Sequence, residues 1–573
     1  MSRSVLDPIS RVGGPLRVEI DLDGGVVADA WVSGTMYRGL EQTLVGRDAR
    51  DAWLLAQRVC GSCGTWHAQA SVRVVEQALG IHVPRNARLI RSLLAGIQLV
   101  VEHAAGFYQM QALDWVDLSS ALAADPAATS VLARSLGDAP NSSAAYFKAI
   151  RARLSTVLGS GQPGPLANGF AGHPAYRLRP EANLLLGAHY LEAFDWRRRI
   201  MRSHVILGGK SPHAQTYLVG GMSVAPDWGG PTRPVAGEHA WKVEKQAPAA
   251  LSLAGLDDLA SILGEAKAFV DEVYLPDVLS IMKVHPDWSA IGRGHGHYLS
   301  FGDFAEDDSD RPRLLLPRGR VMDADLRRLV GVAESGVGES TRHAWYAEDA
   351  SAGQGSGLRH PSDGRTEPRY AGPRPPFESL TGFDRYSWVK APRYEDDPME
   401  VGPLARVLVG AASGSSVARK ALVDATAAVG IGPDGLFSTL GRTVGRAAEA
   451  SIVAGNLERW LQALRDNLAA GDLAVADITL SDPATWPRDA EGWAIGESPG
   501  GATGHWVAIR DHRIERYQIV DGSTWNASPR DGSGRRGAME EALIGTAVAD
   551  PERPIEVLRT IRSFAPCLSC AVH

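Results

Sequence analysis

The sequence contains few cysteines: its 573 residues include only Cys60, Cys63, Cys567 and Cys570. Four cysteines are too few for disulfides to stabilise a chain of this length. They are also too few to hold both a four-thiolate metal centre and an iron–sulfur cluster, because a cluster needs about four ligands of its own. If redox chemistry takes place at these cysteines, the electrons must leave through another subunit.

We also expect no membrane-spanning helix and no secretory leader. No apolar stretch approaches the ~18 residues that a membrane-spanning helix needs, and the start of the chain, Met1–Pro8, lacks the apolar segment of a signal peptide. The net charge of −7 gives no reason to expect nucleic acid as a partner. A hydrophobic content of 44% is typical of a soluble globular protein with a large core.

The four cysteines form two C-x-x-C pairs, Cys60–Cys63 and Cys567–Cys570, and a histidine follows each pair, at His67 and His573. Such thiolates can surround Zn²⁺, Ni²⁺ or an iron centre. The same spacing also suits two redox dithiols, and free cysteines are often plain core residues. A self-contained zinc module closes within about 20 residues, so a site made from both ends of this chain must be assembled by the whole fold.

Hydrophobic periodicity predicts a mainly helical protein with small β-sheets (α+β) around a central helical bundle. Alternation predicts hairpins over 16–32 and 505–520, and a 3.6-residue repeat predicts a long helix from Pro84 through Val101. The same repeat predicts the helices 181–206, 255–283, 417–429 and 439–469, and composition predicts an irregular loop over 346–378. We expect one unit, with the first hairpin and cysteine pair in 1–80, the helical body in 81–480 and the second hairpin and pair in 481–573.

Several motifs together resemble the large subunit of the nickel–iron hydrogenases, especially the uptake type. The likeness covers essentially the whole chain and is carried by Gly34–Glu41, Gly46–Trp53, Arg58–His67, Ala112–Asp117, Tyr386–Arg393, Met399–Arg406, Thr524–Asp531 and Cys567–His573. The resemblance implies an enzyme that splits H₂ heterolytically and reversibly into protons and electrons.

The resemblance also implies the roles of the cysteines. Cys60 and Cys567 would be terminal ligands of nickel, and Cys63 and Cys570 would bridge it to an iron that carries carbon monoxide and cyanide. Cys567 is the expected proton acceptor. His67 resembles the family histidine that hydrogen-bonds a bridging cysteine, a contact that tunes the metal.

Further residues match family positions around the metals. Asp114 resembles a family residue near the metals and is a candidate catalytic residue, as are Cys60, His67 and Cys567. Pro499 and Ser523 are the candidate cofactor-binding residues, with Ser523 as a donor to cyanide. Glu41, the backbone carbonyl of Ile519 and the terminal His573 resemble the ligands of a structural Mg²⁺. These three would fix the end of the chain over the metal pocket.

Three positions depart from the family pattern close to the expected centre. Gly13 replaces the glutamate that usually relays the first proton, Gly500 replaces an arginine above the metals, and Ala565 replaces an aspartate. Losing the arginine together with a carboxylate avoids a buried unpaired charge. Water or Glu41 is then the candidate replacement relay. An alternative is a hydrogenase-like metalloprotein that senses H₂ or acts on another small molecule, with impaired H₂ turnover.

The expected partner is an iron–sulfur small subunit that would carry any export signal and bury an interface of ~2,000 Å² or more. The resemblance is compatible with a membrane cytochrome b or quinone as acceptor and with a dimer of heterodimers. The location expected for the chain is membrane-associated on the periplasmic face, through export of the partner, or cytoplasmic.

Overall fold

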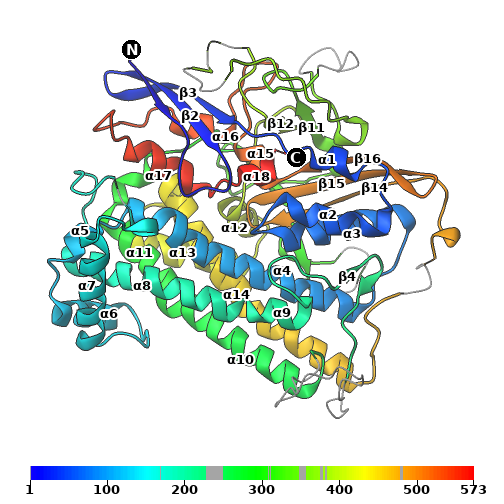
Figure 1. Cartoon of the computed structure of the whole chain (residues 1–573), viewed down its shortest axis with the longest axis horizontal. Coiled ribbons are helices and arrows are strands. Elements are labelled where there is room, and N and C mark those ends of the chain that lie inside the picture. The colour runs from blue at the N-terminus through cyan, green and yellow to red at the C-terminus, as the bar shows by residue number, and fades with distance from the viewer. Residues whose placement is uncertain are drawn as a thin grey trace.

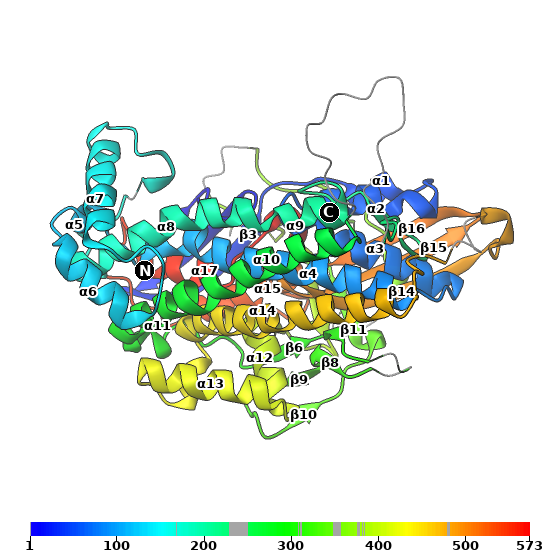
Figure 2. The ribbon, with the colours of Figure 1, turned by 90° about the horizontal axis from the view of Figure 1, so that it is seen from below.

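The computed structural model describes residues 2–572 apart from 168, 228–249, 308, 310–311, 348–356, 375–378, 381, 383 and 478–481. Long helices run side by side through the middle of the molecule (Figures 1 and 2). The longest is α14, Thr439–Ala469, which packs against α4 (Arg85–Gly106), α10 (Leu253–Phe269) and α11 (Leu275–Val284). On its other side α4 contacts α8 (Pro180–Ile200). The predicted central helical bundle is confirmed.

The bundle helices follow from their apolar faces and caps. In α4 the stripe that includes Ile90, Leu94 and Val101 is fully buried. The side chain of Ser438 accepts a hydrogen bond from the amide of Gly441 and starts α14 at the predicted residue. The α4 helix continues through a π-helical turn, Phe107–Gln111, to Asp114.

The run Arg85–Asp114 is long and apolar enough to cross a membrane by length and composition, and 78% of its apolar window is buried inside the protein. The helix predicted from Pro84 is confirmed, whereas the expectation that no apolar stretch approaches about 18 residues is wrong for this run. Its burial among the other helices is that of a core helix.

Two three-stranded antiparallel sheets form near the two ends of the chain. The first joins β1 (Ser2–Leu6), β2 (Leu16–Asp23) and β3 (Val26–Gly34). The second joins β14 (Ala490–Ser498), β15 (Gly501–Arg510) and β16 (Arg513–Val520). Both predicted hairpins are confirmed, and β1 and β14 are additional strands.

The remaining elements cover the bundle, and α12, α13 and the strands β6, β9 and β10 form one side of it (Figure 2). The helices are α1 Leu40–Leu44, α2 Ala52–Ala56, α3 Gly64–Leu79, α5 Leu118–Ala121, α6 Pro126–Leu136, α7 Ala144–Gly159, α9 Arg202–Gly208, α12 Pro403–Ala412, α13 Ser416–Val429, α15 Gly522–Asn526, α16 Ala538–Leu543, α17 Ile555–Ser563 and α18 Leu568–Ala571. The strands are β4 Tyr217–Leu218, β5 Gly221–Met222, β6 Tyr298–Ser300, β7 Asp303–Ala305, β8 Leu314–Leu316, β9 Gly319–Val321, β10 Leu329–Val330, β11 Val337–Ser340, β12 Ala391–Tyr394 and β13 Glu400–Val401. The predicted helices 181–206, 255–283 and 417–429 correspond to α8 with α9, α10 with α11, and α13. The predicted loop 346–378 falls partly outside the described residues.

Segments near the two ends of the chain pair with each other inside the fold. A parallel β-bridge pairs Gly13 with Cys567, and α18 packs against α15. The second cysteine pair begins at the N-terminus of α18, and the first lies in the loop before α3. This crossing brings together two cysteine pairs that are separated by most of the sequence.

Candidate metal centre

All four cysteines converge and none forms a disulfide. The Sγ atoms of Cys60 and Cys567 are 3.6 Å apart, and those of Cys63 and Cys570 are 3.4 Å apart. The sulfurs of Cys60, Cys63 and Cys570 all lie within 4.8 Å of one another. Within the second pair, the sulfurs of Cys570 and Cys567 are 2.9 Å apart. The two longer contacts each join one cysteine of the first pair to one of the second, so the site needs both pairs.

The thiols of Cys60 and Cys570 differ in pKa. Hydrogen bonds from Cys567, Cys570 and Cys63 lower the pKa of Cys60 well below its usual value. Burial, followed by hydrogen bonds with the other three sulfurs, raises the pKa of Cys570 well above it. Soft thiolates at these separations suit a nickel or iron ion, and binding a metal would displace the remaining thiol protons. The donor set therefore fits a metal centre.

A cavity of about 180 Å³ lies against the sulfurs. Its wall contains the four cysteines and the residues Gly13, Gly61, Ser62, Glu102, His103, Gly106, Met110, Arg446, Ser498, Pro499, Gly500, Asp521, Ser523, Ala565, Pro566 and Ser569. Space of this size admits waters and molecules of a few atoms. The wall thus joins α4, the loop after β14 and both chain ends.

Ser523 and Pro499 lie on the cavity wall, and their expected contacts with the metal ligands stay predictions. The Ser523 hydroxyl accepts the backbone N–H of Cys567 at 3.0 Å. Asp521 caps α15 and accepts hydrogen bonds from the hydroxyls of Ser498 at 2.9 Å and Thr503 at 3.1 Å. These contacts fix the second cysteine pair against the turn that carries Pro499.

His67 is fully buried one turn into α3, behind the first cysteine pair. Its Nδ1 lies 3.3 Å from Nε2 of His505, and its Nε2 lies 3.7 Å from Asp521. His505 in turn contacts the hydroxyl of Tyr517 at 2.8 Å. The histidine therefore links α3 to the C-terminal sheet, and its expected bond to a bridging cysteine stays a prediction.

Asp114 does not line the cavity, and its carboxylate contacts two arginines. Its Oδ1 accepts hydrogen bonds from Arg11 and Arg562, both at 2.6 Å. Its backbone carbonyl accepts one from Arg559 at 2.9 Å. The carboxylate therefore anchors the loop before Gly13 and the end of α17, and its expected catalytic role stays a prediction.

The three departures from the family pattern all line the cavity. A Cβ atom at Gly13 would lie 2.9 Å from Sγ of Cys567, which is too close. A Cβ at Gly500 would have ordinary contacts, the nearest being Ser523 Oγ at 3.5 Å. Ala565 has a φ of 48°, a left-handed conformation that alanine rarely adopts. The structure thus gives each of the three positions a different tolerance for a side chain.

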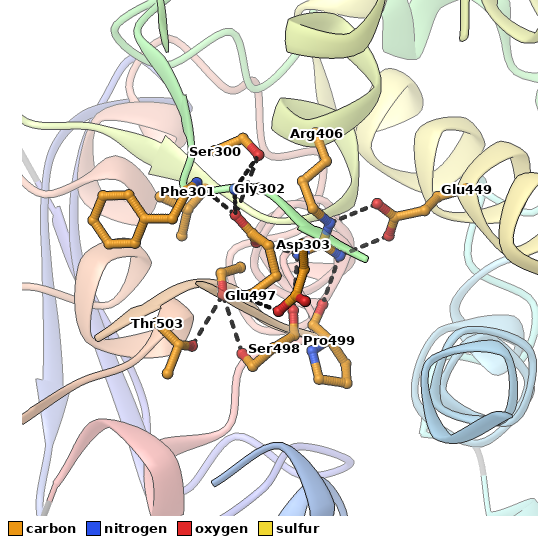
Figure 3. A network of polar contacts seen from close by, with 12 residues as sticks. Ser300, Phe301, Gly302, Asp303, Arg406, Glu449, Glu497, Ser498, Pro499 and Thr503 are labelled. Atoms are coloured by element: carbon orange, nitrogen blue, oxygen red, sulfur yellow. Dashed lines mark hydrogen bonds and ion pairs between the residues drawn. The ribbon is translucent and has the colours of Figure 1, made fainter. Parts of the chain in front are cut away.

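A buried ion network supports the turn that carries Pro499 (Figure 3). Arg406 lies between two carboxylates, with Nε 2.5 Å from Glu449 and Nη1 2.7 Å from Glu497, and it also donates to the carbonyl of Ser498 at 2.8 Å. Burial raises the pKa of Glu497 to about 7 despite Arg406. Although burial acts in the opposite direction, Arg406 lowers the pKa of Glu449 to about 2.

The network reaches the cavity wall through α4. Nε2 of His103 lies 2.6 Å from Glu449, and burial lowers the pKa of His103 to about 4. This histidine is therefore neutral at pH 7. Arg406, held by two carboxylates, fixes both α4 and the strand β14 relative to the cavity.

The predicted magnesium ligands are partly described. Glu41 is buried; its Oε1 accepts the N–H of Ile519 at 2.8 Å, and its Oε2 lies 3.4 Å from Lys390. Burial raises the pKa of Glu41, although Lys390 opposes that effect. His573 lies outside the described residues. Glu41 is absent from the cavity lining, so its suggested role as a replacement relay receives no support.

Sequence reasoning missed several cavity residues, among them Ser62, Glu102 and Arg446. Glu102 and His103 interrupt an apolar helix, Val100 to Ala105, and charged side chains are rarely buried without a reason. That interruption was the available signal. Their approach to the cysteine loop depends on how α4 packs.

The comparisons with known proteins agree with this geometry. The family model described as nickel-dependent hydrogenase matches residues 38–573. The chain belongs to the nickel-dependent hydrogenase family. It is 41% identical to the hydrogenase-1 large chain of Escherichia coli and 42% identical to the uptake hydrogenase large subunit of Bradyrhizobium diazoefficiens, in each case over 100% of this chain and 95% of the relative.

Solved hydrogenase structures share the fold. The reduced Ni-Fe-Se hydrogenase from Desulfovibrio vulgaris Hildenborough matches with a TM-score of 0.76 at 30% identity, covering 100% of both chains. That from Desulfomicrobium baculatum, in a reduced, active form, matches with a TM-score of 0.72 at 31% identity, again over 100% of both chains. The chain is therefore the large, catalytic subunit of a nickel-dependent hydrogenase with a nickel–iron site. The sensor alternative is not favoured.

Proposed function

We propose that the four converging cysteines hold the nickel–iron centre of this hydrogenase in the arrangement that the sequence predicted. Cys60 and Cys567 would hold nickel as terminal ligands, and Cys63 and Cys570 would hold both nickel and an iron that carries carbon monoxide and cyanide. The observation that carries this proposal is the pairing of sulfurs across the two motifs, at 3.6 Å and 3.4 Å. When bound, the metals supply the site at which H₂ is cleaved into protons and electrons.

The chain itself positions the thiolates and encloses the site. Amide N–H groups of Ser62 and Cys63 each donate to Sγ of Cys60 at 3.2 Å, which favours its ionised form. Ser523 Oγ holds the N–H of Cys567 and faces the same cavity, where it can also donate to a cyanide ligand. Cys567 Sγ is the atom that we expect to take the first proton.

A nickel–iron centre also requires partners that carry its electrons away. The cysteine loop reaches the surface at Gly61, which is exposed, so a docked small subunit with iron–sulfur clusters would lie close to the centre. A cytochrome b or quinone acceptor and a dimer of heterodimers complete the proposed assembly. Glu41, the Ile519 carbonyl and His573 would hold Mg²⁺, since the oxygen atoms of the first two are hard ligands that suit that ion.

The test is metal analysis of the complex after substitution of one cysteine at a time. We expect Cys567→Ser and Cys60→Ser to lose nickel, with Ser62→Thr as the control from the same loop that keeps both metals. H₂-dependent dye reduction should follow nickel content. Full nickel content in either cysteine variant would contradict the proposed ligand set.

A further inference from the structure

The missing family glutamate leaves the cavity without a carboxylate at Gly13, and the structure places a different carboxylate on the same wall. Glu102 lies near the end of α4 and lines the cavity. The Ser62 hydroxyl, from the turn between Cys60 and Cys63, donates a hydrogen bond to Glu102 Oε2. A carboxylate therefore contacts the cysteine loop directly.

Helical spacing directs two side chains of α4 at that one serine. Gln98 lies four residues before Glu102, on the same face of the helix, and its amide donates to the backbone carbonyl of Ser62. Gln98 thus holds the main chain of the loop while Glu102 accepts from the side chain. The loop would stay held by Gln98 if the charge at position 102 were removed.

Glu102 is also partly exposed and lies beside a partly exposed arginine of α8. Its side chain is 17% exposed, whereas Gln98 and His103 are buried. Arg197 of α8 lies 3.8 Å from Glu102 Oε1 and is itself 38% exposed. A carboxylate between a cavity and the protein edge is suited to pass protons between them.

We propose that Glu102, acting through the hydroxyl of Ser62, carries protons between the metal cavity and the edge of the chain in place of the glutamate lost at Gly13. In hydrogen oxidation, Ser62 Oγ accepts a proton from the cavity and gives its own to Glu102 Oε2. The hydroxyl ends neutral, the carboxylate becomes a carboxylic acid, and the acid then releases its proton at the outer side. No electron moves in this step.

The electrostatics agree with this assignment. Burial raises the pKa of Glu102, with Arg197 and the Ser62 hydrogen bond opposing it, so the carboxyl holds a proton more readily than an exposed glutamate. The charged and titratable groups that face it are Arg197 from α8 and the thiol of Cys60 from the cysteine loop. Within that loop, Glu102 contacts Ser62 directly.

The key variant is Glu102→Gln in the assembled complex, because the amide oxygen can still accept from Ser62 but cannot carry a proton. We expect nickel and iron content to stay at the wild-type level. H₂-dependent dye reduction and H/D exchange should fall roughly 10²-fold, within the range that proton-transfer residues contribute. Glu102→Asp should recover most of the loss and Ser62→Ala should reproduce it. The control Glu192→Gln removes a partly buried carboxylate of α8 that bonds Asn141, and it should change nothing.

A second readout is independent of turnover. Infrared difference spectra of the complex between low and high pH should contain the C=O band of a protonated carboxylic acid that disappears in Glu102→Gln and persists in Glu192→Gln. The solvent isotope effect on dye reduction should rise in Ser62→Ala. Wild-type rates in metal-replete Glu102→Gln, or an unchanged carboxylic acid band, would overturn the proposal. Loss of the metals from Glu102→Gln would mean that the carboxylate holds the loop, which would equally overturn it.

The inference rests on hydrogen cleavage in this cavity, and the two can fail separately. A metal-replete wild-type complex that neither reduces dye nor exchanges H and D would contradict the function. The infrared band would still show whether Glu102 takes up a proton.

Discussion

Gly13 and Cys567 are paired by a parallel β-bridge, and a Cβ atom at Gly13 would lie only 2.9 Å from the Cys567 sulfur. The backbone of one chain end therefore lies where a side chain would press on a proposed nickel ligand. Glycine here permits close approach of the backbone rather than simply replacing a proton relay.

This contact predicts that Gly13→Ala lowers nickel content, because Cys567 Sγ or its backbone must shift. Gly500→Ala is the matched control on the same cavity wall, since its Cβ would have ordinary contacts. Gly13→Glu should lose metal as Gly13→Ala does, rather than restore proton exchange. Nickel and iron analysis of the purified complexes measures both effects, and full nickel content in Gly13→Ala would refute the steric argument.

Asp114 should matter for stability more than for access to the metals. Asp114→Asn removes the charge that Arg11 and Arg562 share, and breaking a buried ion pair costs about 3–5 kcal/mol. Arg11→Met should cost less, because Arg562 still pairs with Asp114. Thermal unfolding midpoints of the two variants provide the comparison; equal midpoints would show that the arginine pair is not the main role of Asp114.

Gly500 and Ala565 should be coupled. Gly500→Arg alone adds a cation to a wall whose carboxylates, Asp521 and Glu102, already accept hydrogen bonds from other side chains, which is unfavourable. Adding Ala565→Asp supplies a carboxylate from the same wall, at a left-handed position that aspartate adopts more readily than alanine. We expect the double variant to retain more folded, metal-loaded protein and faster H/D exchange than Gly500→Arg. A double variant no better than Gly500→Arg in both respects would argue against compensation.

The stability of the C-terminal region should depend on pH through Glu540 of α16. Burial raises its pKa to about 7, although the N–H of Val32 and the hydroxyl of Tyr386 donate to it. Since the folded state keeps this proton and the unfolded state releases it near pH 4.5, stability should fall as pH rises from about 4.5 to about 7 and then level off. The expected loss is about 3 kcal/mol.

Glu540→Gln keeps the shape and removes the titration. Between pH 5 and pH 8, the unfolding midpoint of the wild type should fall. The midpoint of Glu540→Gln should fall by less. Glu541→Gln, an adjacent carboxylate that pairs with Arg536 near the surface, is the control. The same pH dependence in Glu540→Gln and the wild type would exclude Glu540 as the source.

The periodic parts of the fold were predictable because their signals are local. The helix α14 begins at the predicted residue since Ser438 caps it and its apolar face is continuous. The strand β14 was missed because Gly492 and Gly496 interrupt its pattern. Its pairing with β15 fixes it instead.

The convergence of the four cysteines was predictable from spacing and resemblance, whereas their surroundings were not. Nothing near Asp114 in the sequence indicates Arg562, which reaches it from α17. Likewise, the contact between Ser62 and Glu102 exists only because α4 packs beside the cysteine loop. Contacts between distant segments decide the charge balance of the cavity, and sequence patterns do not record them.

The most direct test of the account is the infrared spectrum of the purified complex together with its nickel and iron content. The account predicts nickel and iron in equal amounts, with carbon monoxide and cyanide stretching bands that vanish in Cys570→Ser. Zinc bound by the four thiolates, with no carbon monoxide or cyanide band, would contradict it.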